Sequence, residues 1–366
     1  MFCRINRDKN NLLSKAYENG DFKKFKNLIK NGHNVNCLSK NNCSLISNVL
    51  LNENDIDKRK NKLFFNLLLE QDAFLGRIGH EKPLLMICAF NKVGIEYMEI
   101  LLNKISEINL ISERVNCLGK NNCYSLMGSL IVEDSFEKIK LLLRYKPDLK
   151  IKGFYHDVVL NELLSRNANP YSKLPVLELL PVFLELGADP NQKCRIDDRS
   201  LHVLIDNCVS EDTDGKLFEI LIKKGADVNS KNKHGITPMM TAAWHDMGWV
   251  IKTLVENNAD MNITNNTGRT AAMIATFKES VNTLMDLNDL GADMKIRDHR
   301  GFNVAHHIAD KCNGLNKYYK FFEKNKGLLL VKNNDGDTVM DIIKTKHPDN
   351  YSDINNILKN NNSIEL

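Results

Sequence analysis

Apolar residues recur along much of the chain at the three-to-four-residue spacing of amphipathic helices. Residues 232–264 contain two such runs: the first includes Ala242–Ala243, and the second carries Val250–Ile251 and Leu254–Val255 on one stripe. Small alanines keep the first helix thin, so that the second can approach it closely. The pattern predicts two short helices packed against each other and joined by a short loop.

This pattern repeats with a nearly constant period. Gly235 and Gly268 are 33 residues apart, Gly268 and Gly301 again 33, and Gly301 and Gly336 are 35. Each glycine is expected in a turn whose backbone conformation is costly for a residue with a Cβ. Thr237–Pro238 is expected to open a helix, because threonine caps free N–H groups and proline is tolerated in the first turn. A constant period without low-complexity composition predicts a stack of repeats, since one unit cannot bury its own apolar face.

The residues of this unit resemble the ankyrin repeat. Residues Gly235–Ala243 read Gly-Ile-Thr-Pro-Met-Met-Thr-Ala-Ala, and Gly225–Asn229 read Gly-Ala-Asp-Val-Asn. The resemblance covers residues 194–345 and extends, with poorer motifs, to the rest of the chain. It implies an all-α ankyrin-repeat solenoid of about ten helix-turn-helix units with short hairpin tips.

The repeat pattern divides the chain into segments of different regularity. We predict an N-terminal capping repeat at 1–38, divergent and enlarged ankyrin-like repeats at 39–193, regular ankyrin repeats at 194–332, and a C-terminal capping repeat and tail at 333–366. Val35–Cys43 recurs as Val115–Cys123, 80 residues later, which indicates a duplicated pair of repeats of about 40 residues each. An insertion at Ser210–Gly215 is predicted to lengthen a loop.

Composition narrows the class of protein. The 366 residues are 43% hydrophobic and 26% charged, as in ordinary globular proteins. A net charge of +4 does not by itself imply nucleic acid, and no stretch has the apolar length of a secretory signal or a membrane span. Nine cysteines, an odd number placed mostly in apolar patterns, indicate reduced thiols in a cytosol-like compartment. We therefore expect a cytoplasmic protein without a cofactor or a membrane partner.

Two pairs of cysteines could suggest a zinc site. Cys37 with Cys43, and Cys117 with Cys123, have a spacing looser than the usual metal knuckle. The pairs also lie two repeats apart, too far for four thiolates to reach one ion. Buried structural thiols are the favoured interpretation.

Two histidines have a structural explanation. His202 and His306 occupy the position of the histidine in the family's Thr-Pro-Leu-His motif, and the resemblance implies that they form hydrogen bonds between turns and repeats. The hydrolase, P-loop and dinucleotide motifs are absent. A Cys–His pair stays open as an alternative, although buried cysteine is usually inert. The candidate pairs are Cys312 with His306 or His307, and Cys194 or Cys208 with His202.

The resemblance also suggests where a partner would dock, because ankyrin proteins usually bind through hairpin tips and the exposed face of the inner helices. Those positions are basic here, with an aromatic residue in each repeat and Asp310 as the one carboxylate nearby, a composition typical of binding hot spots. Alternatively, the cations solvate an exposed face and Trp244 or Phe277 packs between repeats. The predicted partner-binding residues are Lys233, His234, Ile236, Trp244, His245, Arg269, Phe277, Lys278, Arg297, His299, Arg300, Phe302 and Lys311.

The sequence thus predicts a monomeric, non-enzymatic scaffold that binds another protein, one with an acidic surface, through a basic and aromatic-containing concave face. One alternative is an ankyrin-type effector of an intracellular pathogen or symbiont, acting on a host protein in the host cytoplasm. Another is a cryptic Cys/His enzyme within 39–193, where the repeat pattern is poorest. Nucleic-acid binding is not expected, because the net charge is weak.

Overall fold

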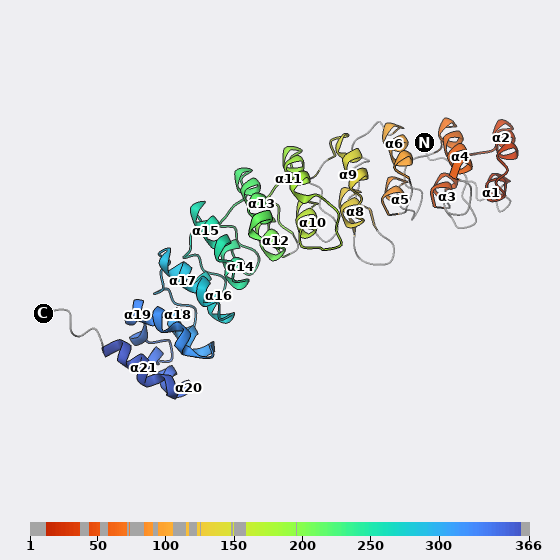
Figure 1. Ribbon diagram of the computed structural model, residues 1–366. Coiled ribbons are helices and arrows are strands. Elements are labelled where there is room, and N and C mark those ends of the chain that lie inside the picture. Colours follow the sequence, from red (N-terminus) through yellow and green to blue (C-terminus); the bar gives the residue numbers. More distant parts are fainter. Residues whose placement is uncertain are drawn as a thin grey trace. The chain divides into compact units, whose positions relative to one another are not determined.

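The computed structural model describes residues 12–36, 44–51, 58–71, 73, 84–90, 94–104, 115–116, 123–124, 126–147, 149, 159–194 and 196–359. Within them the chain forms ten successive pairs of short helices (Figure 1). The predicted all-α repeat architecture is therefore confirmed.

The chain divides into two compact units. Unit 1 comprises Met1–Glu162, Tyr171–Pro175 and Glu185–Ala188, and unit 2 comprises Leu163–Pro170, Val176–Leu184 and Asp189–Leu366. The four-segment division expected from the sequence stays a prediction.

Unit 1 is built around buried rings. Its helices are α1 (Leu12–Glu18), α2 (Phe22–Lys30), α3 (Leu45–Leu51), α4 (Lys58–Glu70), α5 (Leu84–Phe90), α6 (Ile95–Lys104), α8 (Leu126–Val132) and α9 (Phe136–Leu143), and β1 (Val115–Asn116) pairs antiparallel with β2 (Cys123–Tyr124). Phe64 of α4 is fully buried, and the ring centroids of Tyr17, Phe22 and Phe25 lie 4.9–5.3 Å from its own in edge-on geometry. This cluster fixes the second repeat on the first.

Unit 2 continues the same plan with greater regularity. Helix α10 (Val159–Ser165) begins in unit 1, and α11 (Val176–Glu185), α12 (Ser200–Asp206), α13 (Glu211–Lys223), α14 (Pro238–Trp244), α15 (Gly248–Glu256), α16 (Ala271–Phe277) and α17 (Val281–Asp289) follow. The last elements are α18 (Val304–Lys311), η1 (Leu315–Tyr318), α19 (Tyr319–Lys324), η2 (Lys326–Leu330), α20 (Val339–Lys346) and α21 (Pro348–Lys359). The first helices of these repeats, α12, α14, α16, α18 and α20, pack side by side in a row.

Helix starts and turns follow the sequence pattern. Thr237 caps α14 by accepting a hydrogen bond from the Met240 amide at 3.3 Å, and Pro238 is the first helical residue, as predicted. The backbone of Gly268 has a φ of +80°, and a Cβ there would lie 2.9 Å from the amide nitrogen of His299 in the next tip. Glycine is thus required at this tip both for its backbone conformation and for the close approach of the next repeat.

Hydrogen bonds hold each hairpin tip and join it to the next. The Asn232 side-chain oxygen accepts from the amides of His234 and Ile236 at 2.9 and 3.0 Å, and Asn265, Asp298 and Asn333 make the same paired contacts. The amide of Asn266 donates to the carbonyl of His234 at 3.1 Å, which links consecutive tips. The tips of unit 2 therefore form a continuous hydrogen-bonded row.

The predicted loop insertion at Ser210–Gly215 is wrong, because α13 begins at Glu211. The buried Asp214 carboxylate accepts the amides of Val209 and Ser210 at 2.6 and 2.8 Å, and the Asn167 side chain donates to it at 2.6 Å. Acidic residues are favourable in the first turn of a helix, where N–H groups lack partners. The acidic run therefore starts a helix instead of lengthening a loop.

No helix in the part of the chain that the structure describes combines the length and apolarity needed to cross a bilayer.

Candidate interaction surface

Each aromatic residue of the predicted binding set carries a stacked cation. Lys278 Nζ lies 4.2 Å from the ring centroid of Trp244, which is 45% exposed at the end of α14. The guanidinium carbon of Arg269 lies 4.7 Å from the centroid of Phe277, and that of Arg300 lies 3.8 Å from the centroid of Phe302. Such contacts contribute roughly 0.5–1 kcal/mol at exposed sites and hold the long cationic side chains in place.

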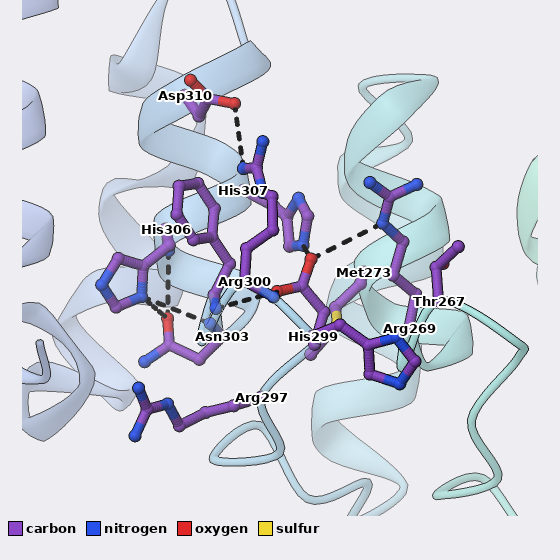
Figure 2. A network of polar contacts seen from close by, with 12 residues as sticks. Thr267, Arg269, Met273, Arg297, His299, Arg300, Asn303, His306, His307 and Asp310 are labelled. Atoms are coloured by element: carbon purple, nitrogen blue, oxygen red, sulfur yellow. Dashed lines mark hydrogen bonds and ion pairs between the residues drawn. The ribbon is translucent and has the colours of Figure 1, made fainter. Parts of the chain in front are cut away.

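A buried carboxylate anchors two of these stacks. The Oδ1 atom of Asp298 accepts the amides of Arg300 and Phe302, each at 2.9 Å. Its Oδ2 atom lies 3.0 Å from Nε2 of His307 and 3.7 Å from Nε of Arg269. Figure 2 shows the side chains of His307 and Arg269 converging from α18 and from the neighbouring repeat. Asp298 therefore ties two consecutive repeats together at their tips.

His307 is a neutral partner in this network. Its side chain is fully buried, and this burial lowers the pKa of the imidazole to about 4. The nearby charge of Asp298 raises the pKa, whereas the charges of Arg269 and Arg300 lower it. Because a carboxylate only accepts, we assign the imidazole proton to Nε2, which donates to Asp298. The Phe277 ring lies 5.4 Å from this imidazole, so the Arg269 stack rests directly on it.

A second carboxylate, Asp310, collects three cations. Lys346 Nζ lies 2.5 Å from one of its oxygens, while Lys311 Nζ and Arg300 Nη2 lie 3.4 and 3.5 Å from the other. Burial alone would raise the pKa of Asp310, but the hydrogen bond and attraction of Lys346 and Lys311 outweigh it and lower the pKa. Three positive charges around one negative charge leave this part of the surface cationic.

The structure places most of the predicted residues on the surface and brings six of them together in three ring–cation pairs. Phe302 is the exception: it is only 7% exposed, so it supports Arg300 from below and is not available to a partner. The exposed members are Lys233, His234, Trp244, His245, Lys278, Arg297, His299, Arg300 and Lys311, and the half-buried members are Ile236, Arg269 and Phe277.

Sequence reasoning missed several members of the site. Asp310 was expected to be the one nearby carboxylate, but Asp298 contacts Arg269, and Asp206 pairs with His245 at 3.0 Å. Lys346 was missed because it belongs to the repeat after that of Asp310, outside the three repeats from which the binding residues were predicted. A signal for Asp298 was present: it stands where the neighbouring tips have Asn265 and Asn333.

His202 makes the contact with the next repeat that the resemblance implied for both motif histidines, whereas the contact of His306 stays within its own repeat. Nε2 of His202 lies 3.0 Å from the carbonyl oxygen of Ile236 in the next tip. His306 contacts the Asn303 side chain through Nδ1 at 2.8 Å. Burial lowers the pKa of both imidazoles, which keeps them neutral.

The candidate Cys–His pairs make other contacts. The Cys312 thiol donates to the Thr276 carbonyl at 3.3 Å, and burial raises the pKa of that thiol. Burial, with Asp214 and Asp206, raises the pKa of Cys208 to about 12, and burial also raises the pKa of Cys194. Protonated thiols are poor nucleophiles.

The cysteines weighed as zinc ligands, for which buried structural thiols were the favoured interpretation, fall almost entirely outside the described residues. Cys37, Cys43 and Cys117 lie outside the described residues, and only the backbone of Cys123 is described. Among the residues that the structure does describe, no group of three or more His, Cys, Asp or Glu side chains is placed to hold a metal ion.

Comparison with known proteins agrees with the repeat fold. The family model described as ankyrin repeats (3 copies) matches residues 174–265 and 205–298. Among solved structures, the ankyrin repeat domain of Bcl-3, described as a unique member of the IkappaB protein family, is similar with a TM-score of 0.53 and 16% identity, covering 66% of this chain and 100% of that chain. At this identity the likeness concerns the fold alone. No curated protein matches. The chain therefore contains ankyrin repeats and has the all-α ankyrin-repeat fold.

Proposed function

We propose that this chain is a non-enzymatic scaffold whose cationic surface in unit 2 binds an acidic face of a partner protein. Ankyrin-repeat domains generally bind other proteins. The proposal that this surface binds an acidic partner depends on three ring-stacked cations from two consecutive repeats. Arg269 and Lys278 belong to one repeat and Arg300 to the next.

Stacking prepares these cations for binding. A long flexible side chain loses roughly 0.5–1.5 kcal/mol of conformational freedom when a partner immobilises it. Arg269 and Arg300 are already held between an aromatic ring and a carboxylate, so less freedom remains to be lost. The exposed Trp244 ring adds apolar area of the kind that dominates binding energy at interfaces.

Local charge supports an acidic partner. Four cations (Arg269, Arg300, Lys311 and Lys346) contact two carboxylates, Asp298 and Asp310. A fifth cation, Lys278, stacks on Trp244, and a third carboxylate, Asp206, lies beside His245. Asp298 is buried and its oxygens are occupied, so it offers little repulsion to an acidic ligand. The excess positive charge would steer an acidic surface toward the tips and speed association.

The test compares two exposed-site variants in affinity capture from native or host cytosol, read by mass spectrometry. The first carries Trp244→Ala and Lys278→Glu, which leave the buried Asp298 network intact. The control carries Lys320→Glu, an equal charge reversal at an exposed position of α19. We expect a protein captured by wild type and by the control, and at least about tenfold less of it with the first variant. Equal capture by all three would refute the cationic surface as the binding site.

Four further hypotheses come from the sequence alone: an effector role, a monomeric state, a cytoplasmic location and a Cys/His enzyme within 39–193. No described residue favours them specifically.

A further inference from the structure

The second helices of the repeats differ sharply in charge. Helices α2 and α4 together contain eight Lys or Arg residues and one carboxylate, a net charge of +7. The other second helices (α6, α9, α11, α13, α15, α17, α19 and α21) sum to −6. If the lysines of α2 and α4 only reflected a lysine-rich composition, similar numbers of cations would be expected on all the second helices. The concentration on α2 and α4 therefore marks a distinct surface.

The two helices lie side by side in unit 1. The rings of Phe22 and Phe25 of α2 pack on Phe64 of α4 at 5.3 and 4.9 Å, and the Tyr17 hydroxyl donates to the Asn61 side chain at 3.0 Å. The apolar sides of both helices are thus turned toward this buried cluster. The exposed cations, here called the α2–α4 basic face, are Lys23, Lys24, Lys26, Lys30, Arg59, Lys60 and Lys62.

Most of this charge is not neutralised. Among the described residues no ion pair involves Lys23, Lys24, Lys26, Lys30, Lys60 or Lys62. Glu53, Asp55 and Asp57 precede α4 and lie outside the described residues. With these three counted, residues 1–70 still carry 13 cations and 7 carboxylates, a net +6, whereas the whole chain carries +4.

The side chains between the cations distinguish two kinds of anionic partner. Leu63 is 50% exposed next to Lys62, while Phe25, Phe64 and Phe65 are buried. A surface for single-stranded nucleic acid would present exposed rings on which bases stack. Lysines grouped around an exposed leucine on an amphipathic helix are instead suited to a bilayer interface, where headgroups carry the negative charge and acyl chains accept apolar atoms.

We propose that the α2–α4 basic face binds the anionic surface of a lipid bilayer. The lysines would contact headgroup phosphates and carboxylates, and Leu63 would enter the interface between them. The sequence led us to expect no membrane partner because no segment can span a bilayer, but peripheral binding by charge requires no span. This surface lies in unit 1 and is separate from the ring-stacked cations of unit 2.

The test is sedimentation of the full chain with vesicles of phosphatidylcholine containing about 30 mol% phosphatidylserine, compared with phosphatidylcholine alone. Each basic residue near such a surface strengthens binding about fivefold. The variant Lys23→Gln, Lys26→Gln, Lys30→Gln, Lys62→Gln is therefore expected to bind at least about a hundredfold more weakly. Glutamine is nearly as good a helix former as lysine, so both helices should persist, which circular dichroism checks.

The matched control removes the same charge from second helices of unit 2, in the variant Lys216→Gln, Lys223→Gln, Lys252→Gln, Lys320→Gln. It should bind these vesicles within about twofold of wild type, since the removed charges lie on helices outside the proposed face. Equal weakening of the two quadruple variants would overturn the proposal, as would equal binding of wild type to the two kinds of vesicle.

A second comparison separates the bilayer from nucleic acid. Leu63→Ser should weaken vesicle binding about tenfold, because an apolar side chain no longer enters the interface. The same change should leave the anisotropy of a labelled single-stranded DNA oligonucleotide unaltered. Unchanged vesicle affinity of Leu63→Ser would overturn the bilayer assignment. So would tighter binding of wild type to the oligonucleotide than to vesicles at equal phosphate and salt.

Discussion

In the parts of the chain that the structure describes, rings pack between repeats in both units, and unit 2 adds a row of hydrogen bonds between its tips. In unit 2, tip amides donate to tip carbonyls, and the side-chain oxygens of Asn191, Asn229 and Asn262 each accept an amide of the next repeat at 2.8 Å. In unit 1, buried rings join the first repeats: three rings surround Phe64, and Phe65 meets Tyr97 at 4.9 Å.

The hydrogen-bonded row of unit 2 helps to explain why that part of the chain is easily recognised. A hydrogen bond between loops needs one residue type at one position in every repeat, which leaves a periodic motif in the sequence. Apolar packing tolerates exchanges of similar volume and leaves only the helical period. The family model accordingly matches residues 174–298, most of which lie in unit 2.

The largest expected effect comes from removing the central ring of unit 1. Phe64→Ala should destabilise that unit by about 3–5 kcal/mol, because a fully buried ring leaves a cavity under three others. The chain has two tryptophans, Trp244 and Trp249, both in unit 2. In urea, the circular dichroism transition should therefore begin earlier while the tryptophan transition stays in place.

Phe218→Ala is the matched change in unit 2, where Phe218 meets Trp249 at 5.5 Å. It should shift the tryptophan transition to lower urea. An equal shift of the tryptophan transition in Phe64→Ala and Phe218→Ala would contradict the prediction that unit 1 unfolds before unit 2 in Phe64→Ala.

The next effect concerns pH and the buried network of unit 2. The pKa of His307 is about 4 in the folded chain and about 6.5 when unfolded, so the unfolded state binds more protons between these values. The stabilising contribution is present above pH 6.5 and is lost as pH falls toward 4, a loss of about 3 kcal/mol. Urea unfolding followed by tryptophan fluorescence at pH 7 and pH 5 measures most of it.

His307→Gln removes the titrating group and serves as the control. Its unfolding free energy should change less between pH 7 and pH 5 than that of wild type, although its stability at pH 7 is lower because the contact with Asp298 is altered. The same pH slope in wild type and His307→Gln would show that another group causes the dependence.

The smallest effect tests the hydrogen bonds by which Asn191, Asn229 and Asn262 each join one repeat of unit 2 to the next. Asn262→Ala removes the acceptor for the Asp293 amide and should cost about 1 kcal/mol. Asn282→Ala alters an exposed residue of α17 and should stay within about 0.5 kcal/mol of wild type. Denaturation midpoints read by tryptophan fluorescence distinguish the two. Equal midpoints would mean that the hydrogen bond from the Asp293 amide to Asn262 adds little to stability.

Features set by neighbours in the chain were predictable. Thr237 and Pro238 start α14, and glycines at positive φ occupy the tips, because these contacts involve residues within a few positions of one another. The acidic insertion was misjudged although it is also local: Asp214 reaches back to the amides of Val209 and Ser210, a cap that composition alone does not reveal.

The candidate surface was only partly predictable. The basic and aromatic positions of three repeats could be aligned from the period, but their pairing could not. Arg269 contacts Asp298, which lies 29 residues later, and Arg300 and Lys346 share Asp310 across two repeats. Phe302 resembles the other rings in the sequence but is buried beneath Arg300.

The sequence by itself determined the repeat, its helices and the residues that cap and turn them, because each of these depends on hydrogen bonds and backbone preferences within one unit. The tertiary structure decided which charges are neutralised. Asp298 becomes a buried anchor and the α2 and α4 lysines stay exposed because stacking brings helices from different repeats into contact. Periodicity alone cannot specify which side chains meet across that contact.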